Sequence, residues 1–204
     1  MSTRLTHTPF LATLFLVFGT NPVPADGLSG QVFIFADMSG SMFGSLPDPV
    51  TFQTQGILTG IAGYQAQCNE IRVTYVPWGN DIGTIIDDDL RNSAGLVRAI
   101  EHSSHIGLGD TKLFAAWSSA AHRFDPTVPT AVVILTNGSG RRYVTAPVPT
   151  ATIYKVAVLS ERAFYYLDNE FLPGIGKTVS ANDVETITKV IEAALRSVDT
   201  LCLG

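Results

Sequence analysis

The feature that most constrains the fold is the continuous apolar run QVFIFAD at residues 31–37. A strand with one solvated face alternates apolar and polar residues, whereas an unbroken apolar run indicates a strand buried on both faces. Two later runs, 130–138 and 151–160, have the same character, and segments with helical spacing of apolar residues lie between the runs. This alternation predicts an α/β fold: a doubly wound, mostly parallel central sheet with helices on both faces, of the Rossmann-like type.

Further elements are expected between and after these strands. Helices are predicted at four segments: 52–67, 93–105, 111–124 and 181–198. Asn182 and Glu185 form a capping-box pattern at the start of the last helix. A strand is expected at 71–79, with 82–87 returning beside it as a hairpin. No internal repeat divides the chain, so we expect one domain spanning 26–204.

The first 25 residues have a different character. A polar lead with Arg4 precedes the apolar stretch 10–18, and the small residues Val23 and Ala25 stand before an expected cut after residue 25. This pattern is typical of a secretory signal peptide, and the apolar stretch is shorter than the roughly 20 residues that span a bilayer. The alternative is an N-terminal anchor or a buried strand. We therefore expect an exported protein, periplasmic or extracellular, without a transmembrane segment in the mature chain.

The composition limits the classes of partner that the chain could bind. Hydrophobic residues make up 46% of the chain and charged residues 15%, and the formal net charge is −5. No basic block is present, which argues against nucleic acid or an anionic membrane surface as a partner.

The chain has two cysteines, Cys68 and Cys202. An even count in an oxidising compartment suggests an intramolecular Cys68–Cys202 disulfide. The alternative is two unpaired thiols.

Small polar residues follow the predicted strands. Asp37, Ser39 and Ser41 alternate after the first strand, Thr111 precedes a helix, and Asn137 follows the strand at 130–138. The carboxyl ends of parallel strands meet at one edge of a sheet, where ligands bind in such folds. Mg²⁺ prefers about six oxygen ligands and retains several waters, so one carboxylate with several hydroxyls could hold it.

These motifs resemble the metal-ion-dependent adhesion site (MIDAS) of von Willebrand factor type A (vWA) domains. The resemblance covers residues 31–200 and is strongest with exported bacterial vWA-like proteins of unestablished function. It implies that Mg²⁺ or Mn²⁺ binds to five residues: Asp37, Ser39, Ser41, Thr111 and Asn137. It also implies that the metal accepts an Asp or Glu side chain from a protein partner.

The sequence departs from the vWA pattern at Asn137, where the family usually has Asp. The amide keeps an oxygen but removes one negative charge, so we expect the metal to bind weakly. Asp110 could restore some charge. The alternative is an empty site in which Ser and Asn side chains only satisfy loop amides.

The expected function is that of a non-catalytic protein-binding module. Two alternatives are a vWA-fold interaction or structural protein that works without metal, and a Mg²⁺-dependent hydrolase. For the hydrolase, the sequence shows no general base or phosphate-binding lysine in a recognisable position.

Other motifs are weaker. The segment PGIGKT at 173–178 lacks the first glycine of a phosphate-binding loop and is expected to be a loop. His102 and His105 have zinc-compatible spacing but no evident third ligand. The acidic run 87–89 is expected to be solvated, and Trp78 to pack in the core or in a lid.

Overall fold

The computed structural model describes residues 28–44, 46–64, 70–104, 112–138 and 150–199. Its strands are β1 (Leu28–Asp37), β2 (Glu70–Trp78), β3 (Ile86–Asp89), β4 (Thr130–Thr136), β5 (Ala151–Val158) and β6 (Lys177–Ala181). Its α-helices are α1 (Pro49–Gly63), α2 (Ala94–Ser103), α3 (Leu113–Ala120), α4 (Glu161–Asn169) and α5 (Val184–Val198).

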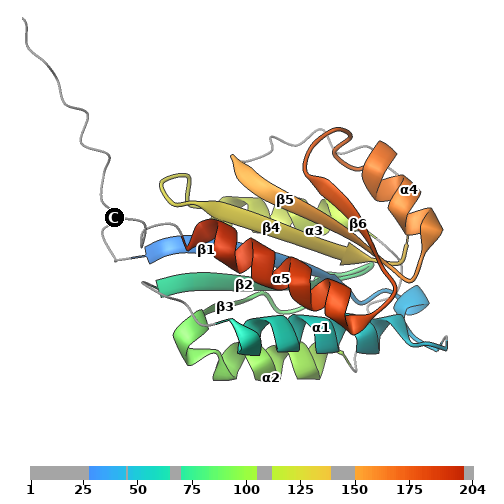
Figure 1. Cartoon of the computed structure of the whole chain (residues 1–204), viewed down its shortest axis with the longest axis horizontal. Helices are drawn as coiled ribbons and strands as arrows, with labels where there is room; N and C mark the ends of the chain where they lie inside the picture. The colour runs from blue at the N-terminus through green and yellow to red at the C-terminus, as the bar shows by residue number, and fades with distance from the viewer. Residues whose placement is uncertain (1–27, 45, 65–69, 105–111, 139–149, 200–204) are drawn as a thin grey trace, which may run out of the picture.

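The strands form one sheet in the order β3-β2-β1-β4-β5-β6, in which only β3 is antiparallel (Figure 1). The first apolar run forms β1, at the centre between β2 and β4. Helices cover both faces of the sheet. The α/β, doubly wound, mostly parallel fold expected from the sequence is therefore confirmed.

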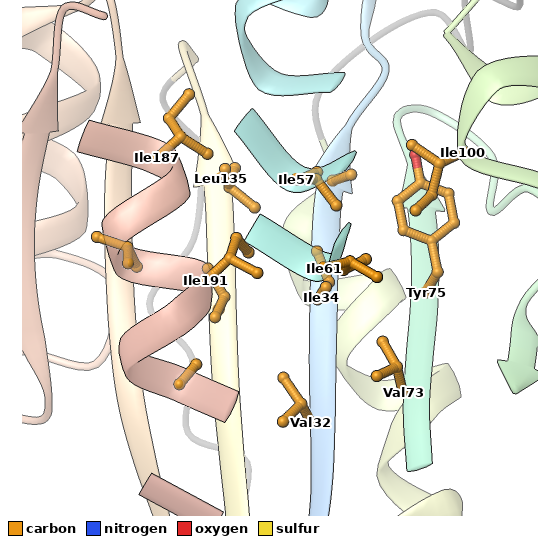
Figure 2. Close-up of a cluster of buried hydrophobic side chains, with 14 of the residues drawn as sticks. Val32, Ile34, Ile57, Ile61, Val73, Tyr75, Ile100, Leu135, Ile187 and Ile191 are labelled. Atoms are coloured by element: carbon orange, nitrogen blue, oxygen red, sulfur yellow. The ribbon is translucent and has the colours of Figure 1, made fainter. Parts of the chain in front are cut away.

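Alternate residues of β1 serve two separate cores. Val32 and Ile34 pack on the face covered by α1, α2 and α5, which is the cluster drawn in Figure 2. Phe33 and Phe35 pack on the face covered by α3 and α4, where the Phe35 ring stacks on Trp117 with centroids 5.5 Å apart. The central strand therefore has no solvated face.

Two elements were absent from the sequence expectations. The amphipathic helix α4 begins after Ser160, whose side chain accepts a hydrogen bond from the Ala163 amide. β6 is a short edge strand with a mixed burial pattern, and its first residues belong to the segment expected to be a loop. Edge strands lack the continuous apolar run that marks a central strand, which explains why β6 was missed.

One local expectation was wrong. The cap of α5 is Asp183, whose carboxylate accepts from the Thr186 amide at 2.6 Å, rather than Asn182. The acidic run 87–89, expected to be solvated, forms part of the edge strand β3, where Asp87 is exposed and Asp88 and Asp89 are half-buried. There Asp87 pairs with Arg123 and accepts a hydrogen bond from the Thr74 hydroxyl.

Some predictions lie outside the described residues: the signal peptide and both cysteines of the Cys68–Cys202 disulfide. Among the helices that the structure describes, none combines the length and apolar character needed to cross a membrane.

Helices α1 and α5 approach closely because glycines of α1 face isoleucines of α5. A Cβ on Gly56 would lie 2.5 Å from the Ile187 Cβ, and one on Gly60 would lie 2.7 Å from the Ile191 Cβ. Figure 2 shows Ile187 and Ile191 beside the isoleucines of α1 over the sheet. The glycines thus set the distance between the two helices that cover the central strands.

We expect Gly56→Ala and Gly60→Ala to lower the free energy of unfolding by about 1–3 kcal/mol, since overpacking forces the helices apart. Gly63→Ala is the control, because its Cβ would meet only the flexible Glu192 carboxylate at 3.3 Å. That change should be neutral or stabilising, as alanine restricts the unfolded chain. Denaturant unfolding measures all three, and equal effects at Gly56 and Gly63 would contradict the packing argument.

One charged side chain is enclosed between the sheet and α4. Lys155 of β5 is 1% exposed, and its Nζ donates to the carbonyls of Leu172 at 3.2 Å and Phe171 at 3.4 Å. Burial disfavours the ammonium form and lowers the pKa of Lys155, with Asp168 acting in the opposite direction. The folded state therefore binds this proton less tightly than the unfolded chain does.

Raising the pH from about 7 to about 10 should stabilise the wild-type protein relative to Lys155→Met. The folded protein releases the Lys155 proton at a lower pH than the unfolded chain, so the penalty for burying the charge shrinks as the pH rises. Urea unfolding of both proteins across this range measures the difference. A difference that stays constant or moves the other way would show that the ammonium carries no such penalty.

Candidate functional site

The candidate site lies where β1 and β4 end side by side. The last register pair of these strands is Ala36 with Leu135, so the next residues, Asp37 and Thr136, stand together at the carboxyl edge of the sheet. Asn137 follows directly. This is the edge at which parallel α/β sheets bind ligands.

Asp37 is a fully buried carboxylate held by its neighbours. Its Oδ1 accepts from the Ser39 amide at 2.8 Å, and its Oδ2 accepts from the Thr136 hydroxyl. Its backbone carbonyl accepts from Gln53 Nε2 of α1 at 2.9 Å. Burial raises the pKa of Asp37, while the hydrogen bonds from Thr136 and Ser39 act against that rise. A cation beside this group would favour its ionised form.

Three further side chains continue the cluster toward solvent. The Ser39 and Ser41 hydroxyl oxygens lie 3.2 Å apart, and Ser41 Oγ donates to Asn137 Oδ1 at 2.8 Å. Asn137 Nδ2 in turn donates to the Ser41 carbonyl at 2.7 Å. Ser39 is buried, whereas Ser41 is exposed and Asn137 half-buried. The oxygens therefore lead from a buried carboxylate to the surface.

The oxygens of this cluster are of the kind that a small hard cation prefers. The Ser39–Ser41 and Ser41–Asn137 oxygen separations of 3.2 and 2.8 Å are those of hydrogen bonds, so these oxygens now bind one another. The described residues contain no group of three or more His, Cys, Asp or Glu that could hold a metal. A cation at this cluster would thus rely on one carboxylate and neutral oxygens.

The structure brings together four of the five expected site residues: Asp37, Ser39, Ser41 and Asn137. Thr111 and Asp110 lie outside the described residues. The Lys112 amide donates to the Gly79 carbonyl at 3.1 Å, just beyond the end of β2. The chain directly after Thr111 is thereby attached to the carboxyl edge of the sheet.

Sequence reasoning missed two residues that support the carboxylate. Thr136 donates to Asp37 and accepts from the Gly138 amide at 2.9 Å, and Gln53 holds the Asp37 carbonyl. Gln53 gave only a weak signal, because the buried face of its helix also carries the polar Thr54. Thr136 gave no such signal, since a threonine at the end of a strand is common.

The remaining candidates do not join this cluster. Trp78 is fully buried, which agrees with core packing. His102 lies on α2, and His105 is outside the described residues. In the described part of the chain, no histidine is hydrogen-bonded to Ser41.

Comparison of the sequence with protein-family models and with curated proteins gave no match. Solved structures are similar in fold. An aerotolerance-related membrane protein from Bacteroides fragilis has a TM-score of 0.61 at 16% identity, covering 81% of this chain and 98% of that one. BatB from Bacteroides thetaiotaomicron has a TM-score of 0.59 at 14% identity, covering 82% and 98%.

A von Willebrand factor type A protein from Catenulispora acidiphila also matches, with a TM-score of 0.54 at 14% identity, covering 81% of this chain and 41% of that one. Together with the strand order, these similarities show that the chain has a vWA-like fold. The fold predicted from the motifs is therefore confirmed. Because the identities are low, the similarities show the fold and do not show the function.

Replacing Asn137 by Asp tests the departure from the vWA pattern. Without metal, Asn137→Asp should lower the free energy of unfolding by about 1 kcal/mol, because an oxygen would face the Ser41 carbonyl in place of the donating Nδ2. With millimolar Mg²⁺ the variant should gain more stability than the wild type, since the added charge attracts the cation.

Asn169→Asp is the matched control, because Asn169 Nδ2 also donates to a backbone carbonyl, that of Tyr165 at 3.0 Å on α4. It should show no added response to Mg²⁺. Thermal melts with EDTA and with Mg²⁺ measure both variants. An equal response from the two would remove any special role of position 137.

Proposed function

We propose that this chain is a non-catalytic protein-binding module whose metal site completes its coordination with an acidic side chain of a partner. The observation that supports it is the oxygen cluster that begins at the buried Asp37 carboxylate and reaches the surface at Ser41. Asp37, Ser39, Ser41, Thr111 and Asn137 would hold Mg²⁺ or Mn²⁺, directly or through water.

The charge of the cluster accounts for the preference for an acidic partner. One carboxylate neutralises only half the charge of a divalent cation, and Asn137 adds an oxygen without adding charge. A metal held in this way keeps an excess positive charge, which favours a carboxylate from outside. The same deficit makes the metal bind weakly in the absence of the partner.

The N-terminal sequence supports a place outside the cytoplasm for this module. The pattern at residues 1–25 is that of a secretory signal peptide, so we propose export to the periplasm or the cell exterior.

Metal dependence is tested by melting the full chain with EDTA and with millimolar Mg²⁺ or Mn²⁺. An ion at 100 times its dissociation constant should add about 2.7 kcal/mol of stability. Asp37→Ala should abolish the gain, because it removes the only buried carboxylate of the cluster. Asp125→Ala, at the loop before β4, should keep it. A stabilisation that persists in Asp37→Ala would place the ion elsewhere.

The same samples test the acidic partner with acetate as the probe. In Mn²⁺-loaded protein, acetate should displace metal-bound water and lower the water-proton relaxation rate, whereas neutral acetamide should not. Equal effects of acetate and acetamide would contradict the carboxylate preference while leaving metal binding intact.

A specific observation favours a second candidate, a vWA-fold interaction protein that works without metal. Ser41 and Asn137 exchange two hydrogen bonds, so their side chains are satisfied by each other. Under this alternative no ion changes the melting temperature of the wild type. Asn137→Asp breaks the pair, so the melting temperature of that variant rises when Mg²⁺ is added. The melts therefore separate the two candidates.

A further inference from the structure

A cavity of about 480 Å³ lies between α2 and the β2–β3 hairpin. Its lining residues are Pro77, Gly83, Thr84, Ile86, Arg98, Ala99, His102 and Ser103. None of them belongs to the hydrogen-bonded cluster around Asp37. Cavities of 300–1,000 Å³ with mostly apolar walls and a few polar groups are the usual form of small-ligand sites.

The walls of this cavity are fixed by hydrogen bonds. The Gly83 amide donates to the Pro77 carbonyl at 2.9 Å, which closes the hairpin side. On the helix side the Ser103 hydroxyl is 2.7 Å from the hydroxyl of the buried Tyr75 and lies 2.9 Å from the Ile100 carbonyl. The site is therefore largely formed before any ligand enters, which limits the ordering that binding requires.

The charge of the lining indicates the class of ligand. Arg98 and His102 stand one turn apart on α2 and both line the cavity, and no acidic residue is among the described residues that line it. No ion pair or hydrogen bond joins either side chain to another described residue. In a chain with a net charge of −5, a guanidinium without a carboxylate beside a cavity favours an anion.

A second cavity differs from this one in the charge of its lining. It has a volume of about 520 Å³ and lies between the start of α1 and the end of α2. Its described lining includes Asp48 and no cationic side chain. A third cavity, of about 400 Å³ on α5, is lined by Lys189 and Arg196 together with Glu192, so its cations stand beside a carboxylate.

We propose that the cavity between α2 and the β2–β3 hairpin binds a small amphipathic monocarboxylate. Pro77, Ile86 and Ala99 contact its apolar body, and Arg98 binds its carboxylate, with His102 and the Thr84 hydroxyl as further donors. A monoanion fits better than a multiply charged ligand, because Arg98 is the only permanently charged group among the described residues of the lining and most of the wall is apolar.

The test uses three probes with the same six-carbon chain: hexanoate, 1-hexanol and hexylammonium. Amide chemical shifts of the ¹⁵N-labelled full chain are followed in EDTA, so that no metal can bind the carboxylate. Hexanoate should shift the amides of Gly83, Ala99 and Ser103 with saturation in the millimolar range. Hexanol should bind more weakly and hexylammonium should cause no saturable shift.

Arg98→Gln should weaken hexanoate binding about tenfold, as expected for the loss of one charge-assisted hydrogen bond, and should leave hexanol nearly unchanged. Arg162→Gln on α4 is the matched control, because it removes an exposed arginine on the other face of the sheet. Ala99→Phe should fill the cavity and abolish binding of both probes.

Several results would overturn the proposal. These are equal binding of hexylammonium and hexanoate, equal losses in Arg98→Gln and Arg162→Gln, or full binding in Ala99→Phe. Binding that persists in EDTA and in Asp37→Ala supports this site independently of the metal site. Binding lost in Asp37→Ala would instead assign the carboxylate to the Asp37 cluster.

Discussion

The burial of β1 on both faces is the constraint on which the rest of the structure depends. Because the strand has no solvated side, its first available position for a charged group is its carboxyl end, where Asp37 stands. The Asp37 carboxylate then bonds to Thr136 at the end of β4 and to the loop amide of Ser39. One side chain thereby joins the two central strands and shapes the loop that carries the hydroxyls.

The site and the cavity beside α2 use the same edge of the sheet in different ways. Asp37 lies at the end of β1. The amide of the following residue, Met38, donates to the carbonyl of Trp78 at the end of β2 at 2.7 Å. Pro77, one residue before Trp78 in β2, lines the cavity on the face of the sheet that α2 covers. We propose that one set of groups binds a cation and the other an anion, although only a few residues separate them along the strands.

Much of the fold was predictable because central strands and amphipathic helices leave strong local patterns. The apolar runs of β1, β4 and β5 marked the strands, and the alternating polar residues after β1 marked the loop of the site. The weak patterns were those of β6, an edge strand, and of Gln53, whose role depends on a carbonyl 16 positions earlier. Contacts distant in sequence, such as Thr136 with Asp37, leave no local periodicity to detect.

By itself, the sequence determined the α/β class and the identity of the oxygen-bearing side chains at the ends of β1 and β4. These follow from local burial patterns and from the rule that parallel strands end at one edge, whereas the vWA-like topology was implied by the resemblance of the motifs to vWA domains. Only the tertiary structure decided that Ser41 and Asn137 bond to each other, that Asp37 is buried enough to raise its pKa, and that Arg98 meets an apolar cavity. Each of these depends on distances between segments far apart in the chain, which packing fixes and local sequence does not encode.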